Sequence, residues 1–261
     1  MNRNEISAKR TEKSIHERPH EDRRGYADRS NETLRLRLRR YGMNGHFEEL
    51  LETHVDDGAV VLDVACGHGQ WADKQLNKTA DVEWYGVDLS AQRIEEATSQ
   101  IDAPGAHFMI GEAEYLPFES NRFDVVVSSA ALHHLPNWDG MALRELTRVL
   151  KSDGVVVFSE PLKYNPLAYT FRRVSPGPCH TPHEHPFPYR TFKNTLQQSF
   201  DDVYIRAHHV VSPLVPLVSG IVGISLPWSL AKSLYDLEQH VLKGQLKGLG
   251  MHVTGVAKSP R

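Results

Sequence analysis

Short apolar runs alternate with amphipathic stretches throughout residues 59–160, and this alternation constrains the fold more than any other feature of the chain. The run FDVVVSSA at 123–130 is apolar enough to be a strand buried on both faces. Such alternation at this spacing predicts a doubly wound parallel sheet. Strands are expected at 59–65, 82–88, 106–111, 123–130 and 155–160, and helices at 70–78, 90–100 (Ser90 as N-cap) and 137–154 (ending at Gly154).

The pattern changes after Glu160. Residues 161–189 are rich in Pro and His and contain no pattern for a long helix, whereas a helix at 190–199 and strands at 202–209 and 250–259 resume the alternation. The chain is therefore expected to be an α/β protein with a doubly wound, seven-stranded, mostly parallel sheet. Residues 59–160 are expected to form a ligand-binding core, and 161–261 a substrate lid, an apolar cap and the last strands.

Two regions precede this core. Residues 1–24 lack apolar periodicity and carry many basic side chains, so we expect a disordered basic arm, either a solvated tail or a contact for RNA or anionic lipid. Residues 25–58 are expected to form a helical cap. Within it, Leu and Arg alternate at 30–42 as in a strand, but Leu34, Leu38 and Tyr41 also share one helical face. A helix is favoured, with Ser30 as its cap and Gly42 as its end.

Composition excludes several classes of protein. The chain has 261 residues, a net charge of -3 and two cysteines, Cys66 and Cys179. The small negative charge does not favour a nucleic-acid binder, and two distant cysteines are no disulfide framework. The first residues are polar and lack the apolar segment of a secretory signal. These features predict a cytoplasmic protein.

The first strand leads into a glycine-containing loop, LDVACGHGQW. Gly67 and Gly69 allow a tight turn and a close approach of backbone to a ligand, and the following helix points unpaired N–H groups toward the same space. Asp88 ends the second strand, where a carboxylate can accept both hydroxyl groups of a ribose. The loop lacks the third glycine of the NAD fingerprint. The pattern indicates a nucleoside cofactor.

Four ordered motifs carry a family resemblance: VLDVACGHG, GVDLS, GEAEYLPFESNRFDVVVSSAALHHL and LKSDGVVVFSEP. Together they resemble class I S-adenosylmethionine-dependent methyltransferases, most of all the small-molecule group that includes quinone methyltransferases, and imply a Rossmann-like fold with S-adenosyl-L-methionine as cofactor. Two positions depart from the family pattern. Ala65 replaces the first loop glycine, and Glu112 stands where Asp is common.

The resemblance implies roles for individual residues. Asp63 would orient the loop and, through water, the methionine ammonium group, while Ser128 and Ser129 would close the pocket beneath the sulfonium. The cofactor-binding set is Asp63, Ala65, Gly67, Gly69, Asp88, Leu89, Glu112, Ala113, Ser128 and Ser129, with His133 and His134 at the rim of the pocket.

The stretch SPGPCHTPHEHPFPYR at 175–190 concentrates side chains that could bind a metal or handle a proton. It follows the fifth strand on the edge where open α/β sheets bind ligands. Its prolines exclude a helix carrying ligands at zinc spacing, so no metal is expected. We expect a substrate lid in which His183 or His185 acts as a general base, with a structural turn as the plainer alternative.

Residues 210–231 contain no charged side chain. Their prolines and glycines make a poor transmembrane helix. An apolar cap, a peripheral contact with a membrane surface, and a helix pair completing the core all remain open.

The sequence therefore predicts a methyltransferase that acts on a small lipophilic acceptor, most simply on a hydroxyl or carboxyl oxygen, with no nucleic acid as partner. The candidate catalytic residues are His183, His185, His133 and His134. Two alternatives remain: an RNA or protein methyltransferase that uses the basic arm, and a non-catalytic partner subunit that keeps the fold.

Overall fold

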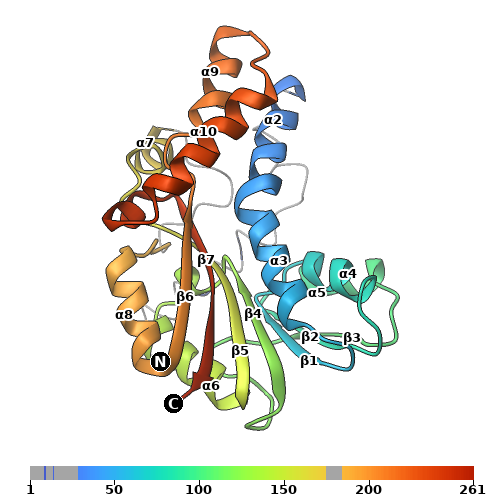
Figure 1. Cartoon of the computed structure of the whole chain (residues 1–261). Helices are drawn as coiled ribbons and strands as arrows, with labels where there is room; N and C mark the ends of the chain where they lie inside the picture. The colour runs from blue at the N-terminus through green and yellow to red at the C-terminus, as the bar shows by residue number, and fades with distance from the viewer. Residues whose placement is uncertain (1–8, 10–13, 15–28, 175–183) are drawn as a thin grey trace.

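The computed structural model of the chain describes residues 9, 14, 29–174 and 184–261. A seven-stranded sheet in the order β3-β2-β1-β4-β5-β7-β6 lies at its centre (Figure 1). The strands β1 to β5 run parallel, and β7 is antiparallel to both β5 and β6. The predicted seven-stranded, mostly parallel sheet is confirmed. The strands are β1 Val60–Val64, β2 Glu83–Asp88, β3 Ala106–Ile110, β4 Phe123–Ser129, β5 Leu150–Pro161, β6 Phe200–His208 and β7 His252–Pro260.

Helices cover both faces of the sheet. On one face, Leu51 and Trp71 pack in a buried cluster with strand residues. On the other face, Leu146 and Phe192 do the same. The helical segments are α2 Arg29–Arg39, η2 Arg40–Asn44, α3 Gly45–His54, α4 Gln70–Leu76, α5 Ala91–Gln100, η3 Leu132–His134, η4 Trp138–Ala142, α6 Leu143–Val149, α7 Pro166–Val174, α8 Tyr189–Ser199, α9 Leu214–Val222, α10 Trp228–Val241 and η5 Gln245–Leu249.

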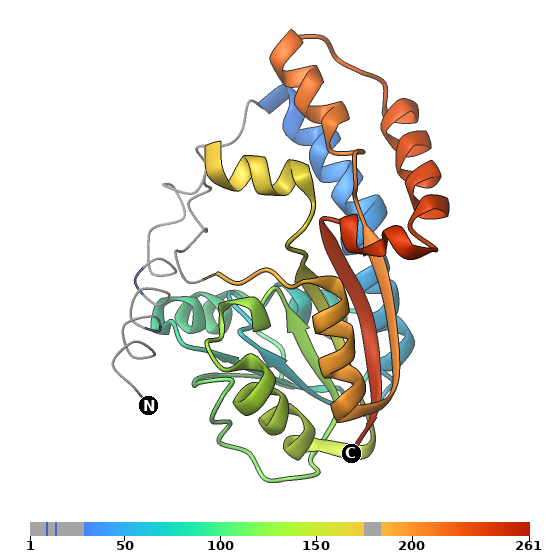
Figure 2. The same ribbon diagram turned by 90° about the vertical axis from the view of Figure 1, so that its left-hand side faces the viewer.

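A third cluster joins α2 to α9 and α10, beyond the carboxyl ends of β4 and β5 (Figure 1). It consists of Leu34, Leu38, Val215, Ala231 and Tyr235, and Tyr41 adds edge-on ring contacts. The face predicted for this helix is therefore the one that packs. Figure 2 shows α7 beyond the same edge of the sheet, so helices from both ends of the chain gather there.

The prediction that Gly42 ends the first helix is wrong. Helical structure continues from Arg29 through a π-helical segment at Arg40–Asn44 to His54. A Cβ at Gly42 would lie 2.7 Å from the His209 ring and 2.8 Å from the Tyr235 ring. Gly42 is thus required for close packing against His209 and Tyr235, and it does not end the helix.

The expected helix at 137–154 is shorter than predicted. It comprises η4 and α6 and ends at Val149, because Leu150 already pairs with Phe123 as the first residue of β5. Gly154 lies within that strand and not at a helix end. Residues 161–189 also contain a helix that was not predicted, α7, whose first turn is held by Asn165 Oδ1 accepting a hydrogen bond from Ala168 N at 2.8 Å.

Residues 210–231 form α9 and the start of α10, which is the helix-pair alternative. Both helices pack against α2 in the third cluster, and the apolar cap and the membrane contact stay predictions. No helix within the described ranges has the length and apolar content needed to cross a bilayer.

Candidate active site

The loop after β1 lies at the carboxyl edge of the sheet and is held by Asp88. Gly67 N donates a hydrogen bond to Asp88 Oδ2, and Ser90 N donates to Oδ1, both at 2.9 Å. The Asp88 carboxylate is buried, and the Arg93 guanidinium lies 3.9 Å from it. Asp88 therefore fixes the glycine loop relative to the end of β2, and its oxygens keep lone pairs for further donors.

The two loop glycines have different roles. Both have positive φ, +58° at Gly67 and +78° at Gly69. A Cβ at Gly69 would lie 2.5 Å from Ile101 Cδ1, so this glycine is needed for packing of the protein itself. A Cβ at Gly67 would meet nothing closer than Arg93 Nη1 at 3.5 Å. Of the two, only Gly67 is placed to admit a ligand. Ala65 also has positive φ, +53°, at the position where the related family has glycine.

Two buried polar atoms at the ends of β1 and β4 have no hydrogen-bond partner of ordinary geometry among the described residues. They are Asp63 Oδ2 and Ser128 Oγ. The strands are adjacent, with Asp63 paired to Val127 and Val64 to Ser128. Burial raises the pKa of the Asp63 carboxyl well above its usual range, and the nearby Asp88 carboxylate raises it further, against a smaller opposing effect of the Trp84 indole. A cationic ligand at this edge would supply the missing partner.

Leu89, Glu112 and Ala113 follow the ends of β2 and β3 beside this loop. Leu89 is half-buried, Ala113 is buried, and Glu112 is half-buried. Glu112 forms an ion pair with Lys9 at 2.5 Å, and Lys9 also reaches the buried Glu114 at 2.7 Å. One residue of the predicted basic arm is therefore held by two carboxylates. The rest of residues 1–24, apart from Ser14, lies outside the described residues.

The segment that follows β4 is held by Glu160, a fully buried residue at the end of β5. Its Oε1 accepts hydrogen bonds from Ala131 N at 3.1 Å and Leu132 N at 2.9 Å, and its Oε2 lies 2.7 Å from His133 Nδ1. Because a carboxylate only accepts, Nδ1 carries the proton of the neutral imidazole and Nε2 carries the lone pair. Ser129 precedes this segment and is half-buried.

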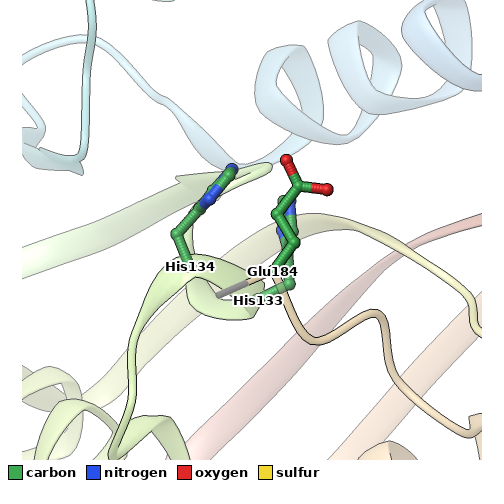
Figure 3. Close-up of side chains that lie close together, drawn as sticks. All are labelled: His133, His134 and Glu184. Atoms are coloured by element: carbon green, nitrogen blue, oxygen red, sulfur yellow. The ribbon is translucent and has the colours of Figure 1, made fainter. Parts of the chain in front are cut away.

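His133, His134 and Glu184 lie together at this edge (Figure 3). The two imidazole rings are 4.0 Å apart at their centroids. Burial lowers the pKa of His133, although the Glu160 carboxylate opposes this shift. In the part of the chain that the structure describes, these three residues are the one group of His, Cys, Asp or Glu side chains spaced for a shared metal ion.

Residues 184–190 are the part of the histidine stretch that the structure describes, and they contact the same edge of the sheet. His185 N donates a hydrogen bond to the His133 carbonyl at 2.9 Å, and Phe187 N donates to the Pro161 carbonyl at 3.1 Å. The His185 side chain is exposed. His183, the other predicted base, lies outside the described residues, as do Cys179 and His180.

Sequence reasoning assigned no role to two residues that organise the site, Glu160 and Asn165. Glu160 was noted only as part of a motif, and its role depends on contacts with residues 27–29 positions away. Asn165 is fully buried, and its Nδ2 donates to the Leu249 carbonyl at 2.8 Å, which ties the segment after β5 to the C-terminal region. The signal that could have identified both residues is their position, because each is a polar residue at or just after the end of an apolar strand.

Comparison with known proteins shows which part of the chain resembles a known family. The family profile described as "Methyltransferase domain" matches residues 61–154. A phthiotriol/phenolphthiotriol dimycocerosates methyltransferase of Mycobacterium ulcerans is 35% identical over 44% of this chain. That match covers 43% of the relative, so the chain spans about two fifths of the length of the curated relatives it matches.

Solved structures agree on the fold. Haemonchus contortus phosphoethanolamine N-methyltransferase 2, in complex with S-adenosyl-L-methionine, is 17% identical with a TM-score of 0.59, over 83% of this chain and 53% of that one. The [4+2]-cyclase SpnF is 18% identical with a TM-score of 0.54, over 82% and 81%. Since one of these proteins is named as a cyclase, the fold alone does not determine the reaction.

Fold and glycine loop together define the class I S-adenosylmethionine-dependent methyltransferase architecture. Residues 61–154 match the methyltransferase domain family, and S-adenosyl-L-methionine is the cofactor of this class. The resemblance inferred from the four motifs is confirmed.

Proposed function

We propose that the chain transfers a methyl group from S-adenosylmethionine to an oxygen of a small lipophilic acceptor. Two observations support cofactor binding at this edge: the buried atoms Asp63 Oδ2 and Ser128 Oγ lack a hydrogen-bond partner among the described residues, and the space that a Cβ on Gly67 would take is open. Buried polar groups without partners are uncommon in folded proteins, and a bound ligand is one physical reason for them.

When bound, S-adenosylmethionine supplies a methyl group on a positively charged sulfur, so the reaction needs alignment of a nucleophile above all. The chain's own residues provide that alignment. Asp88 would accept the ribose hydroxyls while it holds Gly67, and Asp63 would face the positive charge of the methionine moiety. Glu112, Ala113 and Leu89 would line the adenine end. Ser128 and Ser129 would lie beneath the methyl group.

The acceptor would enter from the rim formed by the segment after β4. His133 and His134 lie there, and His185 N donates a hydrogen bond to the His133 carbonyl. An oxygen of the acceptor placed beside these imidazoles would lie on the same edge of the sheet as the glycine loop. A carboxyl acceptor brings an oxygen that is already ionised, whereas a hydroxyl acceptor must lose a proton.

Two observations support a lipophilic acceptor. The relative named above, from Mycobacterium ulcerans, is named as a methyltransferase of phthiotriol dimycocerosates. The cap also exposes apolar side chains, among which Ile221 is 75% exposed. The exposed apolar surface of α9, the following loop and α10 consists of Val218, Ile221, Val222, Ile224, Leu230, Leu237 and Val241.

This apolar surface lies next to basic side chains on α2, which packs against α9. Arg35 and Arg37 are exposed on that helix, and Arg40 is exposed at the start of η2. Apolar side chains that enter the acyl boundary, with arginines that attract anionic head groups, form an interfacial membrane-binding surface. We expect the chain to bind vesicles of anionic phospholipid more strongly than neutral ones. Ile221→Asp should weaken that binding, and an exposed apolar control on β3, Ile110→Asp, should leave it unchanged.

The test of the proposed activity is transfer of a labelled methyl group. The chain is incubated with methyl-labelled S-adenosylmethionine and separate lipid, RNA, protein and polar extracts. We expect label in the lipid extract, and none with Asp88→Asn, which lacks one of the two oxygens that hold the loop. Label in RNA or protein would favour use of the basic arm. Cofactor binding without labelling of any extract would indicate a non-catalytic subunit.

A further inference from the structure

The cluster of His133, His134 and Glu184 joins two segments that are distant in the sequence. The histidines belong to η3, directly after β4, and Glu184 belongs to the segment that precedes α8. One donor atom from each residue lies within 4.8 Å of the others. Figure 3 shows the three side chains extending from the carboxyl edge of the sheet in the same general direction. None of the cofactor contacts proposed above uses Glu184, so cofactor binding does not explain why the three side chains lie together.

A second, independent observation concerns the orientation of His133. Its Nδ1 is 2.7 Å from the buried Glu160 Oε2, and the other oxygen of Glu160 is held by two backbone N–H groups. The ring can therefore neither rotate nor exchange tautomers without breaking a buried hydrogen bond, and Nε2 is left as the lone-pair donor. Carboxylates orient metal-binding histidines in this way in many metalloproteins.

We propose that His133, His134 and Glu184 bind a divalent transition-metal ion. Two imidazole nitrogens and one carboxylate are ligands that suit zinc and related ions, whereas magnesium and calcium prefer oxygen ligands alone. Three protein ligands leave a fourth position open, which is the arrangement of catalytic rather than structural zinc sites.

The geometry requires only a modest contraction. Ligands about 2.1 Å from a tetrahedral ion lie roughly 3.4 Å from one another, compared with a limit of 4.8 Å in the structure. His134 and Glu184 are both half-buried, whereas His133 is buried and its ring is held by Glu160. The carboxylate of Glu184 supplies a negative charge to the ion directly, and that of Glu160 supplies one through the His133 ring.

The role of the ion rests on the proposed methyl transfer. An acceptor hydroxyl at the open position would lose its proton to solvent more readily, because a bound cation lowers the pKa of the oxygen. That oxygen would then form a bond to the methyl carbon as the carbon–sulfur bond breaks, and the electron pair of the broken bond would remain on sulfur. The sequence predicted no metal because it considered ligand spacing within residues 175–190 alone.

The test measures metal binding without reference to activity. The tag-free full chain is stripped with chelator and titrated with Zn²⁺, and with Co²⁺ as a spectroscopic probe, in the wild type and in His134→Gln and Glu184→Gln. We expect one equivalent per chain with visible Co²⁺ bands of low coordination number, and binding at least tenfold weaker in each variant. His240→Gln, which changes an exposed histidine on α10, is the matched control and should bind as the wild type does.

Calorimetry with S-adenosylhomocysteine separates this proposal from the proposed function. The nucleoside should bind all four proteins equally, which also shows that the variants are folded. If the wild type takes up less than a tenth of an equivalent of either ion, or if both variants bind as tightly as the wild type, the metal site does not exist. Either result leaves the methyl-transfer proposal to its own test.

Discussion

Glu160→Gln tests how the buried carboxylate determines the state of His133. Glu160 accepts two backbone hydrogen bonds through Oε1 and one from His133 Nδ1 through Oε2. Glutamine keeps one acceptor oxygen and has nearly the same shape, but its NH₂ group faces Nδ1 as a donor. Two donors cannot bond to each other, so the ring must move its proton from Nδ1 to Nε2. The variant should therefore remove the lone pair from Nε2.

The expected magnitudes follow from these contacts. Hydrogen bonds to charged groups contribute about 1.5–3 kcal/mol each and neutral ones about 0.5–1.5 kcal/mol. Three bonds weakened by about 1 kcal/mol each, less the relief from no longer burying a charge, give a loss of about 1–3 kcal/mol in the free energy of unfolding. Loss of an orienting carboxylate typically weakens metal binding by about 10–100-fold.

Three measurements check this prediction. Urea unfolding gives the stability, ¹⁵N chemical shifts give the tautomer of His133, and a Co²⁺ titration gives the metal affinity. Glu145→Gln is the matched control, since Glu145 also accepts a backbone N–H, from Leu116 at 2.8 Å, and its side chain accepts from Arg148. A His133 ring that keeps its proton on Nδ1, with Co²⁺ binding within twofold of the wild type, would refute the reasoning.

Three further predictions follow from individual residues. Ala65→Gly should raise the free energy of unfolding by about 0.5–1 kcal/mol. Glycine removes the cost of the left-handed conformation, about 1–2 kcal/mol, and this gain exceeds the cost of the added entropy of glycine in the unfolded chain. A urea midpoint that does not rise would contradict this. Binding of S-adenosylmethionine should tighten with rising pH while Asp63 titrates, since the raised pKa of its carboxyl means that a cationic ligand must displace a proton. Calorimetry across pH should show this dependence in the wild type and none in Asp63→Asn. Burial lowers the pKa of His46 to about 4, that of His209 to about 3 and that of His208 well below its usual value, so the unfolded chain binds protons that the folded chain does not. Stability should therefore be complete above about pH 6.5 and fall toward pH 4 by up to about 1.4 kcal/mol per pH unit for each proton, and an unchanged urea midpoint between pH 7 and 4.5 would be the contrary result.

The parts of the fold that could be predicted are those set by local pattern. The five parallel strands, the Ser90 cap and the glycine loop follow from apolar periodicity and from residues with strong conformational preferences. Ser90 Oγ does accept from Arg93 N at the start of α5. Such features depend on residues within a few positions of one another, which a single sequence displays directly.

The failures concern contacts between distant segments. Gly42 looks like a helix end, but the space beside it is filled by His209 and Tyr235, more than 160 positions later. Glu184 joins His133 and His134 across about 50 positions, which no local spacing rule can anticipate. Leu150 matches the helical pattern of its neighbours, yet strand pairing with Phe123 determines its conformation. Tertiary contacts override local preference at all three places.

A crystal structure of the chain with S-adenosylhomocysteine tests the central claim most directly, because that claim places the cofactor at a defined edge of the sheet. We predict that the ribose hydroxyls lie within hydrogen-bond distance of the Asp88 carboxylate and that the homocysteine moiety lies against Gly67. Asp63 Oδ2 and Ser128 Oγ should each gain a polar partner, from the nucleoside or from a bridging water. A nucleoside bound elsewhere, or one at this edge that leaves Asp88 without contact to the ribose, would contradict the account.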